Sequence, residues 1–125
     1  MLKEAMLAMR VTDMDFAPEI CGYLKSAETD LKMAGVVISG TCVFVISEDA
    51  QTGEVTVTDS STITDDAVKT AMITYARMHF GSPPDYDKLA ASYDLQRRQL
   101  ANATGYTNFT GETAESQETQ AGGST

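Results

Sequence analysis

Few side chains in this chain of 125 residues could support catalysis or bind a metal. The single histidine, His79, is the natural candidate for a general base or a metal ligand. It falls on the apolar side of a predicted helix, however, and a histidine metal site normally needs several ligands that converge on one point. We therefore interpret His79 as a packing residue.

Paired carboxylates are the second kind of candidate, because two neighbouring acids can divide acid and base work between them. Asp13 and Asp15 form one pair, and Asp65 and Asp66 form another. Both pairs precede predicted helices, where aspartates cap free backbone N–H groups. No serine or cysteine lies in a nucleophile motif, and no glycine-rich loop is suited to a phosphate. We therefore expect no enzyme activity, no catalytic residue, no cofactor and no metal.

The two cysteines, Cys21 and Cys42, have no metal-binding spacing. The N-terminal stretch contains Glu4 and no long apolar segment, so no secretory signal is evident, and we expect a protein made in the cytoplasm. In that reducing compartment the default is two free, buried thiols, although the sequence leaves a disulfide open. The longest apolar run, 36–46, is interrupted and too short to cross a bilayer, so we expect no membrane partner.

The best-delimited elements are two helices within residues 64–105, joined by a short turn. Thr64 is expected to cap the first helix, which Gly81 and the two following prolines end. Asp85 is expected to cap the second helix, and Gly105 to end it. The positions expected to face the core are Val68, Met72, Tyr75, Ala76, His79 and Phe80 in the first helix, and Tyr86, Leu89, Tyr93 and Leu100 in the second.

Helical spacing also predicts helices over 1–10 and 16–35. Between the two helical pairs the pattern changes to β-branched and alternating residues, which predicts a hairpin of 42–47 with 54–58. The fold class is therefore mainly α: a small helical bundle of about four helices with an inserted β-hairpin at about 41–60 and an extended C-terminal tail. Two strands alone are marginal in water, so the hairpin is expected to pack on the helices or on another copy.

The composition changes after Gly105, which divides the chain into a helical domain, 1–105, and a tail, 106–125. Tyr106 and Phe109 are the last large apolar residues, and the remainder is small, polar and acidic. Such a segment cannot repay the entropy of its own ordering, so we expect it to be flexible or to be ordered by a partner.

The formal net charge of −9 is unevenly distributed. Residues 36–63 contain four acids and no base, and residues 106–125 contain three acids and no base, whereas residues 64–105 contain five of each. Affinity for a phosphate backbone comes from lysines and arginines that release counterions, so direct binding of nucleic acid is disfavoured. Two interpretations of this charge stay open: a surface that repels DNA, or one that meets a basic partner, as in an acidic soluble module that mimics DNA or regulates a basic protein.

Arg97 and Arg98 are adjacent near the end of the last predicted helix. Asp94 precedes Arg98 by four residues, a spacing that permits a surface ion pair. Two interpretations stay open: the arginines complement the helix dipole and pair locally, or they contact an acidic neighbour in an assembly.

Segment 64–107 carries the pattern DDAVKTA, Y-A-R, F-G, then P-x-D-Y, S-Y-D, Q-x-x-Q-L and a closing G-Y-T. In this pattern the chain resembles the tailed-phage head–tail connector family, also described as adaptor, DNA-packaging or head-completion proteins. The helix over 16–35, ending in AETDLKMAGV, is similar to the long second helix of that family. The length and acidity of residues 41–63 and the tail after Phe109 depart from its shorter members.

The resemblance implies a helical bundle that assembles with itself into a ring, dodecameric in the family, beneath the portal protein. Such a ring joins the portal to a further neck or tail-completion protein in the virion, and DNA passes through its lumen without specific binding. The family has no catalytic residues and no cofactor. From the residues and the resemblance together, the candidate interface positions are Glu48, Asp49, Glu54, Arg97, Arg98, Tyr106 and Phe109.

Overall fold

The computed structural model describes residues 1–103 of the chain. The elements in order are α1 (Leu2–Met9), the short 3₁₀ helix η1 (Met14–Phe16), α2 (Ala17–Met33), β1 (Phe44–Glu48), β2 (Val55–Asp59), α3 (Asp66–His79) and α4 (Tyr86–Asn102). This confirms a mainly α bundle of four helices with an inserted antiparallel hairpin. The predicted C-terminal tail and the helix end at Gly105 involve residues outside the described part.

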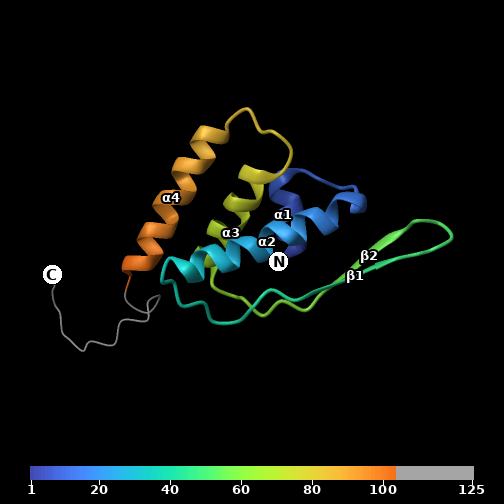
Figure 1. Ribbon diagram of the computed structural model, residues 1–125, viewed down its shortest axis with the longest axis horizontal. Coiled ribbons are helices and arrows are strands. Elements are labelled where there is room, and N and C mark those ends of the chain that lie inside the picture. The colour runs from blue at the N-terminus through green and yellow to red at the C-terminus, as the bar shows by residue number, and fades with distance from the viewer. Residues whose placement is uncertain (104–125) are drawn as a thin grey trace.

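Helix α3 is the centre of the bundle, with α2 and α4 packed against it, and α1 contacts both α2 and α3 (Figure 1). Most of the buried core side chains come from α2 and α3, because the apolar residues of these helices recur at helical spacing on the faces that meet. The largest fully buried side chains are Ile20, Leu24, Leu31, Met72, Val68, Cys21 and Cys42.

Helix α3 begins slightly later than the sequence indicated. Asp65, not Thr64, is the N-cap, and its carboxylate accepts from the backbone N–H groups of Ala67 (2.9 Å) and Val68 (3.1 Å). The expectation for Thr64 was wrong because the aspartate that follows it satisfies two free N–H groups of the first turn.

Helix α4 differs from expectation at its start. Tyr86 was expected in the core but is 46% exposed, because it opens α4 after α3 has already ended at His79. At the other end the helix stops at Asn102, and the next residue, Ala103, is extended.

The hairpin leaves the helical body and projects beyond it as an arm (Figure 1). The hairpin contacts the helical body mainly through β2, which meets α2 and η1. No helix among residues 1–103 combines the length and apolarity that a bilayer crossing requires. The fold thus presents a helical body and one extended arm, and the arm positions the candidate site.

Candidate functional site

The arm is an antiparallel pair in which Val45 lies opposite Thr58 and Ile46 opposite Val57. Opposite residues of a ladder point to the same face, so the two faces of the arm alternate along each strand. Val45 is 59% exposed on one face and Ile46 is 46% exposed on the other. Both faces of the arm therefore carry β-branched apolar side chains in contact with solvent.

The tip of the arm, residues 48–54, is acidic. Glu48, Asp49 and Glu54 are all exposed. Asp49 also builds the turn, since its carboxylate accepts from the backbone N–H groups of Gln51 (2.8 Å) and Thr52 (3.1 Å). These two bonds lower the pKa of Asp49. Three of the seven predicted interface residues are thus brought together at one exposed point.

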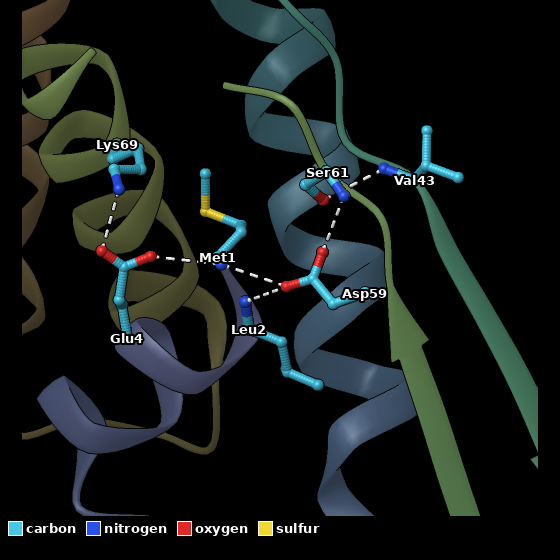
Figure 2. Close-up of polar contacts among 7 residues, drawn as sticks. All are labelled: Met1, Leu2, Glu4, Val43, Asp59, Ser61 and Lys69. Atoms are coloured by element: carbon cyan, nitrogen blue, oxygen red, sulfur yellow. Dashed lines mark hydrogen bonds and ion pairs between the residues drawn. The ribbon is translucent and has the colours of Figure 1, made fainter. Parts of the chain in front are cut away.

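Asp59, at the base of the arm, forms the first of two anchors (Figure 2). Its carboxylate accepts from the backbone N–H of Leu2 (2.8 Å), pairs with the amino group of Met1 (3.0 Å) and accepts from the backbone N–H of Ser61 (3.0 Å). Burial alone raises the pKa of Asp59, but these hydrogen bonds outweigh it and lower the pKa to about 2. The end of β2 is thereby fixed to the start of α1.

The anchor continues into the helical body (Figure 2). The Met1 amino group also pairs with Glu4 (3.1 Å), and the second carboxylate oxygen of Glu4 accepts from Lys69 of α3 (2.9 Å). On the arm side, the Ser61 hydroxyl accepts from the backbone N–H of Val43 (3.1 Å). A network of hydrogen bonds and ion pairs, most of them charge-assisted, therefore joins α3, α1 and both sides of the arm base.

Glu28 of α2, which is only 6% exposed, forms the second anchor. Its carboxylate accepts from the Thr41 hydroxyl (2.8 Å) and the backbone N–H of Cys42 (3.3 Å), and it pairs with Lys32 (3.1 Å). Burial alone raises the pKa of Glu28, but the bonds from Thr41, Lys32 and Cys42 lower it overall. Lys25 of the same helix donates to the Cys42 carbonyl (3.3 Å).

Gly40 marks the place where the two sides of the arm base come closest. Its φ of 95° lies in the left-handed region, and an added Cβ would lie 2.6 Å from the carbonyl oxygen of Thr62. Thr62 in turn donates its backbone N–H to the Thr41 carbonyl (2.9 Å) and accepts from the Thr41 N–H through its hydroxyl (3.0 Å). Glycine is required at position 40 because both its conformation and its neighbour exclude a side chain.

An apolar groove of about 460 Å³ lies where the arm meets α1. Leu7, 79% exposed, and Met14, 39% exposed, border it together with Val57 of β2. Since Val57 faces the same side of the arm as Ile46, the groove and that face form one continuous apolar surface. Uncovered apolar surface of this kind is characteristic of interaction sites.

Arg97 and Arg98 lie on α4, on the helical body and not on the arm. Arg97 pairs with Asp30 of α2 (3.0 Å) and with Asp94 (3.1 Å), and it lies over the ring of Tyr93. Arg98 pairs with Asp94 (3.0 Å), the contact that the four-residue spacing predicted. Both guanidinium groups are thus engaged within the chain, which leaves their role at an interface a prediction.

Tyr93 extends the same network. Its hydroxyl donates to Asp30 (2.5 Å). Burial raises the pKa of the phenol, and the bond to Asp30 raises it further. Tyr106 and Phe109, the remaining predicted interface residues, lie outside the described part of the chain.

The side chains that could support catalysis or bind a metal occupy structural positions instead. His79 packs between the rings of Tyr75 (centroids 4.4 Å apart) and Tyr23 (5.8 Å). Cys21 and Cys42 are free and buried, and burial raises the pKa of each thiol to about 11, so both are protonated at neutral pH. Within residues 1–103, no three His, Cys, Asp or Glu side chains are grouped to hold a metal ion.

The two anchoring carboxylates were not predicted as functional positions. The sequence did contain a signal for Glu28, which lies four residues after Leu24 and three before Leu31 on the apolar side of α2. A carboxylate at such a position must find partners in the fold. Asp59 gave no comparable signal, because its partner in α1, Leu2, is 57 residues away in the sequence.

Comparison with known proteins adds no relative to this description: no protein-family model, curated sequence or solved structure matches the chain.

Proposed function

We propose that this protein is a structural component of a tailed-phage virion, a connector that forms a ring between the portal protein and the next neck or tail component. In this role it completes the head and extends the channel through which DNA passes. It performs no catalysis and needs no cofactor. It is made in the cytoplasm of the host bacterium and ends in the virion neck.

The observation that carries the proposal is the exposed and anchored arm. Val45 and Ile46 leave apolar surface on both faces of a two-stranded sheet, which is marginal in water on its own. The carboxylates of Asp59 and Glu28 nevertheless fix the base of the arm to the body. A rigid arm reduces the entropy lost on binding, so this arrangement is suited to assembly with other protein copies.

Two further features support a connector over other structural roles. The motifs of segment 64–107 resemble that family, and they include α3 and α4 of the bundle. Four acids and no base lie in residues 36–63, so the arm repels phosphates. A surface of this kind can border a DNA channel without retaining the DNA.

The proposal is tested by mixing the purified protein with the cognate portal protein and following co-sedimentation and particle shape by electron microscopy. We expect rings, free or on the portal. A double variant Val45→Thr, Ile46→Thr keeps strand propensity while removing exposed apolar surface, and it should lose assembly. The matched control is Met33→Thr, which removes an 83% exposed methionine from the end of α2 and should assemble normally.

A strictly monomeric protein that ignores the portal would contradict the connector proposal. Mass spectrometry of purified phage particles provides an independent check, since a connector must be present in them.

The acidic tip favours one alternative, a soluble module that occupies the site of a basic protein. Glu48, Asp49 and Glu54 are all exposed there, as such a module requires. On this alternative, neutralising the three acids abolishes binding to the basic partner, while the protein stays monomeric and absent from phage particles.

A further inference from the structure

Two arginines of the helical body lack ion-pair partners in the described part of the chain. Within residues 1–103, Arg97 and Arg98 are paired, whereas Arg10 and Arg77 form no ion pair and are exposed. Arginine is enriched at protein interfaces. In a chain with a net charge of −9, two arginines without ion-pair partners are therefore candidates for contact with another molecule.

Arg10 and Arg77 line the same groove, of about 440 Å³, where the ends of α1 and α3 meet the start of α4. Its apolar lining includes Met9, Phe80 and Leu89. Arg10 is the C-cap of α1 with a φ of 58°, a left-handed conformation that residues other than glycine rarely adopt. The groove therefore offers two guanidinium groups beside apolar walls, a setting that recognises carboxylates.

The tip of the arm has the complementary charge. Glu48, Asp49 and Glu54 are exposed, and no base lies anywhere in residues 36–63. Five residues per strand give the paired part of the arm a length of about 16 Å. The tip projects away from the helices of its own chain (Figure 1). A basic site that binds the tip must therefore belong to another molecule.

We propose that the acidic tip of one copy docks into the groove lined by Arg10 and Arg77 on the next copy. This inference rests on the proposed ring and names the contact that builds it. Tip and groove are different surfaces, so each copy uses its tip for one neighbour and its groove for the other. Such a head-to-tail contact closes into a ring when the rotation between copies divides a full turn.

Asp85 also lines the groove and carries the wrong charge for an acidic ligand. With the charge of Asp85 set against those of Arg10 and Arg77, the groove has one net positive charge. The contact is therefore moderate in strength and sensitive to salt. Replacing this carboxylate, in the variant Asp85→Asn, should tighten the association of copies.

A charge-reversal experiment tests the contact. The tip variant Glu48→Lys, Glu54→Lys and the groove variant Arg10→Glu, Arg77→Glu should each self-associate about tenfold or more weakly than the wild type. Mixed together, each variant supplies the charge that the other needs, so the mixture should associate again. Sedimentation velocity, with and without the portal protein, measures the three samples, and circular dichroism checks that each variant is folded.

The control is Lys88→Glu, which reverses an exposed base of α4 that does not line the groove and should leave association unchanged. Variants that associate like the wild type, or a mixture of folded variants that does not associate, would overturn the contact. So would a wild-type chain that never self-associates, alone or on the portal.

These failures differ from failure of the connector proposal. If copies bind the portal without the tip-to-groove contact, the contact is wrong and the connector role stands. If the protein is absent from phage particles, the connector role is wrong, and the charge-reversal experiment still decides whether the contact forms. The acidic tail is the competing occupant of the groove. If truncation after Gly105 abolishes association and reversal of the tip does not, the tail occupies the groove and the tip contact is wrong.

Discussion

Removal of the Glu28 carboxylate should release the arm from the body. In Glu28→Ala, the buried backbone N–H of Cys42 loses its acceptor, which costs about 1–3 kcal/mol, and the charge-assisted bond from Thr41 is lost as well. The pair with Lys32 adds little, because that lysine is 51% exposed. We expect a loss of about 2–4 kcal/mol in the free energy of unfolding, a large share of the total for a small domain.

Urea unfolding followed by circular dichroism measures this loss, and hydrogen exchange locates it. Amides of residues 41–62 should exchange faster in Glu28→Ala than in the wild type. Glu28→Gln keeps an acceptor for Cys42 and should cost about 1 kcal/mol. The control Glu54→Ala removes an exposed acid from the tip and should stay within about 0.5 kcal/mol of the wild type. Equal midpoints for Glu28→Ala and Glu54→Ala would refute the anchoring role.

Three other outcomes are expected. The pKa of Asp59 is about 2 in the fold against 3.8 in its absence, so its stabilisation is complete above pH 3.8 and is lost as the pH falls toward 2. Asp59→Asn should flatten that part of the urea-midpoint profile and lower stability by about 1 kcal/mol near neutral pH, after allowance for solvent screening. Gly40→Ala should destabilise by about 1–3 kcal/mol through its clash with Thr62, whereas Gly22→Ala, with nothing within 4 Å, should stabilise by about 0.5–1 kcal/mol in thermal melts. Truncation after Gly105 should leave the melting curve unchanged but prevent stable attachment to the portal, as co-sedimentation will reveal.

The helices could be predicted because their determinants are local. The apolar spacing of α2 runs through Ile20, Leu24 and Leu31, and all three are fully buried. The hairpin was also predictable from its alternation, although its strands begin and end one or two residues away from the expected limits.

The position of the arm could not be predicted in the same way. Whether the hairpin packs on the helices or projects from them depends on contacts between distant parts of the chain. The bonds of Asp59 to Leu2 and of Glu28 to Cys42 join residues that sequence patterns do not relate. The arginine groove likewise arises only when the end of α1 meets α3 and α4, so neither Arg10 nor Arg77 was a candidate from the sequence.

The candidate site was predicted in part. The acids of the tip, Glu48, Asp49 and Glu54, were identified from charge alone, and the fold gathers them at the end of an exposed arm. Arg97 was considered for the same kind of contact, but a partner on another helix, Asp30, engages it within the chain. Local spacing revealed Asp94 as a neighbour of Arg98 and gave no indication that Asp30 would pair with Arg97.

The most direct test of the central claim is electron cryo-microscopy of the protein bound to its portal. We predict a closed ring in which each arm is covered by an adjacent copy, with Val45 and Ile46 removed from solvent. A ring whose arms stay uncovered, or a portal that carries no ring, would contradict the claim that the anchored arm is the assembly surface.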